Sequence, residues 1–263
     1  MQHDVADLME FYRTPLGHVA RRLLSQQIRA RWRGLTGGTL MGLGFSTPYL
    51  APFRSEVTRL GALMPDTQGA LVWPRTGPAL TVLVEEDRLP LPDNSVDRLI
   101  CVHGLEVAGR PEAVLREIWR VLAPEGRLLL IVPNRRGVWA RLDTTPFGQG
   151  RPYSRSQLEH LLIQSLFRPV GWDGALYFPP FDRRVLVRSA TVWERIGRRL
   201  TTRIAGVILV EAKKELMAPI GKAAKARALR ELVTVRREPE DVEAKSAVRA
   251  TAALLSRATG TGS

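Results

Sequence analysis

The feature that most limits how this chain can fold is a regular alternation of short apolar runs with helical patterns. Apolar runs of four to eight residues are typical of buried strands, and apolar residues at intervals of three and four are typical of helices. Parallel strands need crossover connections, so this alternation indicates a parallel sheet with helices packed on it. The predicted strands span residues 39–43, 69–73, 80–84, 98–103, 127–132, 170–177 and 206–210. They predict an α/β fold with a doubly wound, mostly parallel, seven-stranded sheet.

Helices are predicted between most of these strands. Thr47-Pro48 opens the first of them, and Ser154 followed by Gln157 forms a capping box for a later one. The segment between strands 69–73 and 80–84 is too short for a crossover helix, so we expect a loop there. The predicted helices span residues 47–60, 111–122, 154–166 and 192–203.

A further helix is predicted ahead of the sheet, from Thr14 to about Arg33. Thr14 suits its N-cap and Pro15 its first turn. Apolar residues form one stripe and arginines occupy much of the rest, so the helix either caps the main domain or lies on an anionic membrane. The predicted regions are a helical cap (1–37), an α/β domain (38–213) and a basic, partly helical or disordered tail (214–263).

Charge and cysteine content narrow the partners and the compartment. The chain holds 39 Lys and Arg against 26 Asp and Glu, a net charge of +13. Such a field attracts phosphates, anionic lipid or acidic partners, although arginine-rich composition also arises from genome bias. The single cysteine, Cys101, is expected in the core, and no metal site is expected. Neither a membrane span nor a secretion signal is recognisable, so we expect a cytoplasmic protein.

Two motifs lie in the order and at the spacing of a known family: LPLPDNSVD at residues 89–97 and EIWRVLAPEGRL at residues 117–128. They resemble the type 11 class I methyltransferases, in which LPFPDxSFD precedes strand four and ExxRVLxPGG precedes strand five. Residues 153–169 are similar to the same family. The segments FYRTPLGHVARR, WPRTGP and VPNRRGVWARLDTTPFGQGRPYS resemble an alphaproteobacterial subgroup of unassigned substrate. The resemblance implies a Rossmann-like methyltransferase fold and S-adenosylmethionine as the cofactor.

The resemblance places the cofactor at the ends of the first strands. In the family an acid and a glycine-rich turn follow strand one, so Gly42, Gly44, Ser46 and Thr47 are expected to contact the cofactor. Gly42 stands at the acid, Ser46 at the second glycine, and only Gly44 keeps one of the family's three glycines. The following helix start offers donors to a carboxylate or phosphate, although a tight turn without a ligand fits the same residues.

The family's acids after strands two and three form the rest of the expected site. On the predicted strand 69–73 the first acid falls at Trp73-Pro74-Arg75, so no carboxylate is expected there. Losing two hydroxyl bonds to a charged partner, at about 1.5–3 kcal/mol each, lowers affinity by ~10²–10⁴. Glu85 and Glu86 are expected to contact the adenine, although a solvated acidic rim also fits.

His103 follows strand four, where family members present the cofactor and the substrate. We expect it to contact the cofactor, and it is the candidate general base because imidazole changes charge near neutral pH. A hydrogen-bonded structural histidine is the alternative. Methyl transfer needs mainly an in-line approach, because the sulfonium is already activated, so no second catalytic residue is required.

Three functions are compatible with this sequence. The leading hypothesis is an S-adenosylmethionine-dependent methyltransferase that acts on a small molecule or a protein, with the loop 134–152 and the helix from Thr14 shaping the acceptor pocket. The second is a non-catalytic binding module that kept the fold and lost cofactor affinity. The third, a nucleic-acid methylase or binder, is not favoured because few aromatic residues accompany its candidate arginines. Those arginines are Arg135, Arg136, Arg141 and Arg151.

Overall fold

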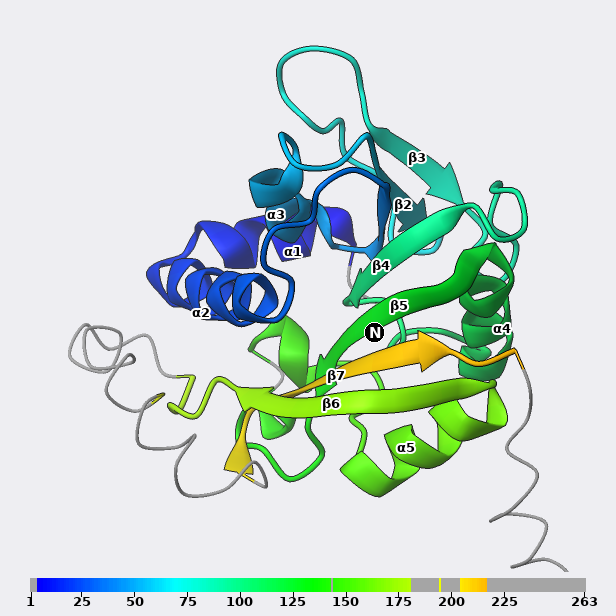
Figure 1. Cartoon of the computed structure of the whole chain (residues 1–263). Helices are drawn as coiled ribbons and strands as arrows, with labels where there is room; N and C mark the ends of the chain where they lie inside the picture. The colour runs from blue at the N-terminus through cyan, green and yellow to red at the C-terminus, as the bar shows by residue number, and fades with distance from the viewer. Residues whose placement is uncertain (1–3, 143, 181–193, 195–203, 217–263) are drawn as a thin grey trace, which may run out of the picture. The chain divides into compact units, whose positions relative to one another are not determined.

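The computed structural model describes residues 4–142, 144–180, 194 and 204–216. A seven-stranded sheet lies at its centre, with the strand order β3-β2-β1-β4-β5-β7-β6 (Figure 1). Strands β1 to β5 pair in parallel, and β7 is antiparallel to both of its neighbours. This confirms the predicted α/β fold. The strands are β1 (Thr39–Gly44), β2 (Arg59–Pro65), β3 (Thr81–Val84), β4 (Val96–Val102), β5 (Leu122–Pro133), β6 (Phe167–Ala175) and β7 (Val207–Lys214).

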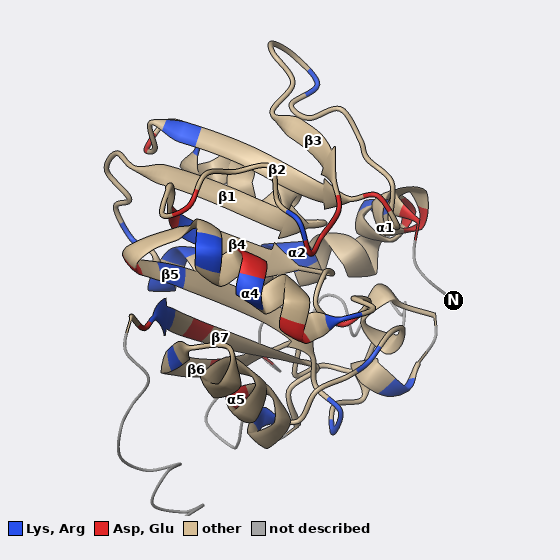
Figure 2. Ribbon diagram, turned by 90° about the vertical axis from the view of Figure 1, so that its right-hand side faces the viewer, with Lys and Arg blue, Asp and Glu red and all other residues tan. Residues whose placement is uncertain are grey.

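Helices cover both faces of this sheet (Figure 1). One buried cluster joins α1, α2 and α3 to strand residues such as Ile100 and Leu209. The other joins α4 and α5 to Leu99 and Val210, which are adjacent in sequence to those two strand residues. Adjacent strand residues fall in different clusters because successive side chains point to opposite faces. On α4, basic and acidic residues alternate at the surface (Figure 2). The helices are α1 (Val5–Arg13), α2 (Pro15–Arg31), α3 (Thr47–Leu50), α4 (Pro111–Val121) and α5 (Arg155–Gln164), with 3-10 turns η1 (Ala51–Phe53), η2 (Trp139–Arg141) and η3 (Pro146–Gly148).

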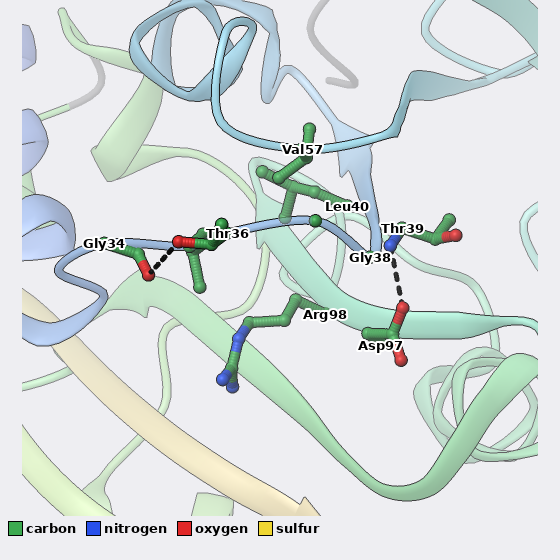
Figure 3. A pocket seen from close by; sticks show the side chains of 10 residues that line it. Gly34, Thr36, Gly38, Thr39, Leu40, Val57, Asp97 and Arg98 are labelled. Carbon is green, nitrogen blue, oxygen red and sulfur yellow. Dashed lines mark hydrogen bonds between the residues drawn. The ribbon is translucent and has the colours of Figure 1, made fainter.

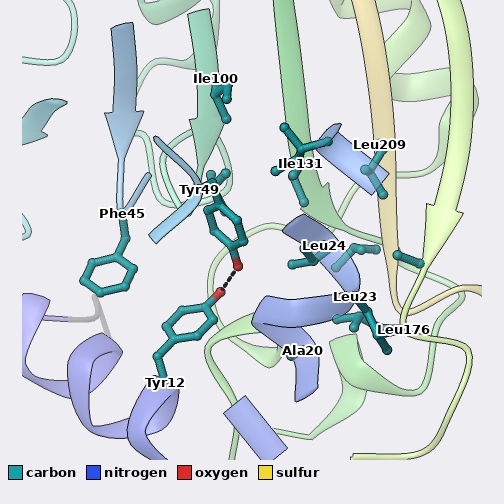
Figure 4. Packing of buried hydrophobic residues seen from close by; sticks show 14 of the residues in the cluster. Tyr12, Ala20, Leu23, Leu24, Phe45, Tyr49, Ile100, Ile131, Leu176 and Leu209 are labelled. Atoms are coloured by element: carbon teal, nitrogen blue, oxygen red, sulfur yellow. Dashed lines mark hydrogen bonds between the residues drawn. The ribbon is translucent and has the colours of Figure 1, made fainter. Parts of the chain in front are cut away.

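The helix predicted from Thr14 is α2, and it is part of the core. The Thr14 side chain accepts a hydrogen bond from the Gly17 N–H at 3.0 Å, as expected of an N-cap. Leu23 and Leu24 on α2 point toward strand residues of the sheet, Leu209 among them (Figure 4). The apolar stripe of α2 is therefore buried inside the protein, which favours the cap over a membrane-bound helix.

Several predicted elements are confirmed at nearly their predicted bounds. The strands at 39–43, 80–84, 98–103 and 127–132 correspond to β1, β3, β4 and β5. The capping box before α5 is complete, because Ser154 Oγ accepts from the Gln157 N–H and the Gln157 side chain accepts from the Ser154 N–H. The segment between β2 and β3 contains no helix, as predicted.

Two predictions around β2 are wrong. The helix predicted over 47–60 stops at Leu50 and continues only as the 3-10 turn η1, because Pro52 has no N–H to extend the hydrogen-bonded ladder. The chain then enters β2, which pairs with β1, so the strand predicted at 69–73 lies instead in the β2–β3 connection. Both runs are apolar, but only the first continues in register along β1. Of the helix predicted at 192–203 only Glu194 is described, and the tail from residue 217 lies outside the described residues.

The two signature motifs have a structural role that the fold makes visible. Glu117 on α4 accepts a hydrogen bond from the Leu89 N–H at 3.0 Å. Arg120 donates to the carbonyl oxygens of Leu89 and Leu91 at 2.9 Å each and to Asp93 Oδ1 at 2.6 Å. Residues 89–93, which lead into β4, are thus tied to the helix that leads into β5.

The amino-terminal end of the sheet, where β1 and β4 begin, has a cavity of about 360 Å³ (Figure 3). It is lined by the glycine-rich segment before β1 together with Asp97 and Arg98, and Asp97 Oδ2 accepts from the Thr39 N–H at 2.7 Å. Ligands of parallel α/β sheets bind at the carboxyl ends of the strands, so the candidate site is expected at the opposite end of the strands from this cavity.

Within the described part of the chain no helix is long and apolar enough to cross a membrane.

Candidate active site

A tight turn after β1 brings the backbone of Gly44 against the end of β4. Gly44 has a φ of +74°, a left-handed conformation that suits glycine, and a Cβ there would overlap the carbonyl oxygen of Val102. A Cβ on Gly42 would overlap the Ser46 side chain, so this turn has no room for the family's acid. Ser46 and Thr47 are buried, and the Ser46 hydroxyl has no hydrogen-bond partner among the described residues. A buried hydroxyl without a partner is a group that a ligand can satisfy.

A cleft of about 490 Å³ opens where β2 and β3 end. Asp66 directly follows β2, and its N–H donates to the carbonyl oxygen of Val84 at 2.9 Å. Glu85 directly follows β3, and both carboxylates are exposed and line the cleft beside Leu89. Arg88 lines the cleft as well, together with the two carboxylates and the apolar residues. The carboxylates accept hydrogen bonds only, so they suit a ligand that presents hydroxyl or amino groups.

Asp66 overturns the prediction that no carboxylate follows strand two. That prediction took residues 69–73 as the strand and found Trp73-Pro74-Arg75 at its end. The register with β1 shows that β2 ends at Pro65. The acid that holds ribose hydroxyls in Rossmann-like folds therefore has a counterpart in this chain.

A buried polar cluster lies at the end of β4, around His103. His103 is 2% exposed, and its Nε2 lies 2.8 Å from the hydroxyl of Tyr12 on α1. The Tyr12 hydroxyl also lies 2.8 Å from that of Tyr49 on α3 (Figure 4). On the other side of the ring, Nδ1 lies 3.3 Å from Glu106 Oε1 without forming a hydrogen bond, and Gln68 Nε2 donates to the His103 backbone carbonyl. The imidazole therefore lies between the Glu106 carboxylate and the Tyr12 phenol, which in turn contacts the Tyr49 phenol.

Aromatic rings enclose this cluster. The Tyr12 ring stacks on Phe45 at 5.4 Å between centroids with an interplanar angle of 13°, and it meets Tyr49 edge-on at 6.3 Å. Phe147, from the loop after β5, lies 4.7 Å from the His103 ring. The prediction that the loop 134–152 lies at the site thus gains support from Phe147. Water is excluded from His103 by these rings, which strengthens electrostatic interactions there.

The phenols of the cluster stay neutral near neutral pH. Burial raises the pKa of Tyr12 well above its ordinary value, and the neighbouring Tyr49 and the Glu106 carboxylate act in the same direction. Burial also raises the pKa of Tyr49. Both hydroxyls therefore act as hydrogen-bond donors and acceptors. Cys101 is a buried core residue, as predicted, and burial raises the pKa of its thiol.

The structure brings most of the predicted site residues to one edge of the sheet. Gly44 contacts the backbone at His103, while Glu85 lines the cleft with Asp66. Glu86 differs, because its carboxylate accepts a hydrogen bond from the Gly109 backbone, and its pKa is raised by burial. Of the predicted ligands, Glu85 lines the cleft at the ends of β2 and β3, whereas Gly42, Gly44, Ser46, Thr47 and His103 lie at the ends of β1 and β4.

Four residues of this region were missed from the sequence or not given a role. Asp66 was hidden by the misplaced strand, although the run GALMP-D ends in an acid as a β2 strand of this fold does. Tyr12 lies on α1, which was not predicted, although Asp4 and the apolar spacing from Val5 to Tyr12 are typical of a capped amphipathic helix. Tyr49 and Glu106 gave no signal beyond their proximity to the turn and to His103.

A sheet in this strand order with an antiparallel β7, a glycine turn after β1 and acids after β2 and β3 defines the class I methyltransferase fold, a Rossmann-like α/β architecture. The comparisons agree with this class. Residues 41–130 match the family described as a methyltransferase domain. A solved S-adenosylmethionine-dependent methyltransferase from Thermotoga maritima superposes with a TM-score of 0.55 and 14% identity over 80% of this chain and 96% of that one.

Two further relatives show how far the similarity extends. Demethylmenaquinone methyltransferase from Deinococcus radiodurans is 30% identical over 122 residues, which is 46% of this chain and 49% of that protein. The chain thus spans about half the length of this curated relative. The [4+2]-cyclase SpnF has a TM-score of 0.51 and 20% identity over 75% of this chain and 81% of that one. The same fold therefore supports chemistry other than methyl transfer.

Proposed function

We propose that this protein is an S-adenosylmethionine-dependent methyltransferase. S-adenosylmethionine is the cofactor implied by the domain match and by the methyltransferases that share the fold. The observation that carries the proposal is the pair of carboxylates, Asp66 and Glu85, in one cleft at the carboxyl ends of β2 and β3. The subgroup resembled by the sequence, the predicted region boundaries and the cytoplasmic location stay predictions.

The residues present fit this cofactor. Asp66 would accept hydrogen bonds from the ribose hydroxyls. Glu85, which directly follows the neighbouring strand β3, would contact the adenosine part of the cofactor. Gly44 and the unpartnered hydroxyl of Ser46 form the turn that would face the methionine end. When bound, S-adenosylmethionine supplies an activated methyl group on its sulfonium.

His103 is the proposed general base. Tyr49 donating to Tyr12, and Tyr12 donating to Nε2, uses each hydroxyl proton once and leaves Nε2 as the acceptor. The Nδ1–H then faces the buried carboxylate of Glu106. A proton taken up at Nε2 creates an imidazolium, which this carboxylate stabilises, as the carboxylate of a catalytic triad does. Glu106 is accordingly a positioning residue for His103.

Calorimetric titration with S-adenosylhomocysteine tests the cofactor site without needing an acceptor. We expect a micromolar Kd in the wild type and a loss of about 10–100-fold in Asp66→Asn, because a hydrogen bond to a charged group contributes about 1.5–3 kcal/mol. Glu112→Gln removes a carboxylate from the first turn of α4, outside the cleft, and should bind like the wild type. Absence of heat from the wild type at millimolar ligand would reject the proposal.

The binding-module alternative loses its main argument. It was motivated by the absence of acids from the cofactor turn and from the end of strand two, and the structure supplies the second of these as Asp66. The acid of strand one is replaced by Gly42, and the buried packing of the turn there leaves no room for it. Micromolar binding of the cofactor product would count against this alternative.

A further inference from the structure

The residue that fills the acceptor side of the candidate site is the protein's own phenol. Tyr12 comes from α1, the first helix of the described chain, and its hydroxyl takes the 2.8 Å position on Nε2 of His103 where a substrate hydroxyl would give up its proton. Its ring is held face-on by Phe45 and edge-on by Tyr49 and His103. The cage is thus complementary to a hydroxyaryl ring in both shape and hydrogen bonding.

We propose that the methyl acceptor is a hydroxyaryl compound whose ring and hydroxyl displace those of Tyr12 from the cage formed by Phe45, Tyr49, His103 and Phe147. This rests on the proposed methyltransferase function. The acceptor hydroxyl gives its proton to Nε2 of His103 while its oxygen bonds to the methyl carbon. The sulfonium S–CH3 bond breaks, and its electron pair remains on sulfur as the thioether of S-adenosylhomocysteine.

Two observations distinguish this acceptor class from a purely apolar compound. The cage presents two polar atoms to the ring substituent, His103 Nε2 and Tyr49 Oη, and both are satisfied by a single hydroxyl that donates to one and accepts from the other. Behind the imidazole, both oxygens of the buried Glu106 have no hydrogen-bond partner among the described residues. Glu106 Oε1 lies 3.3 Å from Nδ1 of His103, so the carboxylate lies behind the ring and Nε2 faces the ligand position.

Tyr12 also sets the apparent affinity of the wild type. When a site is open in only a fraction of molecules, the apparent Kd of its ligand equals the intrinsic Kd divided by that fraction. Removing the Tyr12 ring should therefore strengthen hydroxyaryl binding while leaving His103 and Tyr49 in place. Tyr12 lies on the helix α1 and not on a strand of the sheet, so its displacement requires no change in strand pairing.

The test compares p-cresol, which reproduces the Tyr12 side chain, with toluene, which lacks the hydroxyl, by calorimetry and ligand-observed NMR on the full chain. We expect Tyr12→Ala to bind p-cresol at least tenfold more tightly than the wild type does, and about tenfold more tightly than it binds toluene. His103→Leu in the same background should abolish the preference for p-cresol. Tyr153→Ala removes a half-buried tyrosine that bonds Leu105 instead, and should create no such preference. Tyr12→Leu serves in place of Tyr12→Ala if the latter does not fold.

The outcomes separate this inference from the function on which it rests. Equal binding of p-cresol and toluene by Tyr12→Ala, or binding of neither, overturns the hydroxyaryl site even if S-adenosylhomocysteine binds the same sample. Hydroxyl-selective binding that depends on His103 supports the site even if S-adenosylhomocysteine fails to bind, and then only the methyltransferase proposal falls. With S-adenosylmethionine supplied as the methyl donor, mass spectrometry should detect methylated p-cresol, and formation of a methylated amine from p-toluidine alone would contradict the assigned acceptor class.

Discussion

Replacing Arg120 by alanine should destabilise the fold, because it frees the segment before β4. The guanidinium donates to two backbone carbonyls, of Leu89 and Leu91, and to the carboxylates of Glu117 and Asp93. Charged hydrogen bonds contribute about 1.5–3 kcal/mol each, while partly exposed ion pairs add about 0–1 kcal/mol. The freed side chain regains up to ~2 kcal/mol of conformational entropy. We therefore expect a net loss of about 2–4 kcal/mol in the free energy of unfolding.

Urea denaturation monitored by tryptophan fluorescence measures this loss. Arg116→Ala is the matched control, because Arg116 lies on the same helix, is exposed and makes no hydrogen bond or ion pair in the described structure, so its effect should stay within about 0.5 kcal/mol. Hydrogen exchange should report faster opening of residues 89–93 in Arg120→Ala only. If both variants lost the same free energy, the signature would not hold the segment before β4, and the structural role given to it would be wrong.

Three further changes probe other parts of the fold. The pKa of Glu117 is held below its usual range mainly by the hydrogen bonds from Arg120. The ionised carboxylate therefore stabilises the fold at pH values above its unfolded pKa of about 4.3, and this stabilisation is lost as pH falls through the folded pKa. Glu117→Gln should accordingly flatten the fall in unfolding free energy between about pH 5 and pH 3. Gly44→Ala should cost about 1–3 kcal/mol and weaken S-adenosylhomocysteine binding at least tenfold by calorimetry, whereas Gly109→Ala, with open space around it, should do neither. Glu211→Gln should cost about 1–3 kcal/mol in chemical denaturation, because it removes the charge on which Trp32 and Arg127 converge, and an unchanged midpoint would contradict this.

The seven-stranded, mostly parallel sheet could be predicted because local patterns agree with the fold. The run RLICVH at 98–103 and the capping box at Ser154 each have one structural solution, and both are found where expected. The region from 47 to 73 could not be predicted in the same way. Two apolar runs compete there for the role of β2, and the choice depends on pairing with β1, a non-local contact that composition does not encode.

Only those residues of the candidate site could be predicted whose positions follow from local backbone structure, such as a turn or the end of a strand. Gly44 could be located because a left-handed turn selects glycine, and Glu85 because it ends a clear strand. The contact of Tyr12 with His103 joins residues 91 positions apart, and neither residue type indicates the other. Asp66 could be found only from the correct end of β2, so the misplacement of this one strand concealed a candidate cofactor-binding acid.

The two halves of the candidate site are in different states, and this decides how the function should be sought. The cleft at Asp66 and Glu85 is open to solvent, whereas His103 is buried under Tyr12. A cofactor can therefore bind before anything at His103 moves, while an acceptor must first displace α1 from the cage. SpnF shows that this fold also serves other chemistry, so cofactor binding alone would not establish methyl transfer. Under the proposed acceptor site, displacement of Tyr12 by a hydroxyl ligand while S-adenosylhomocysteine is bound distinguishes a methyltransferase from a scaffold that only binds the cofactor.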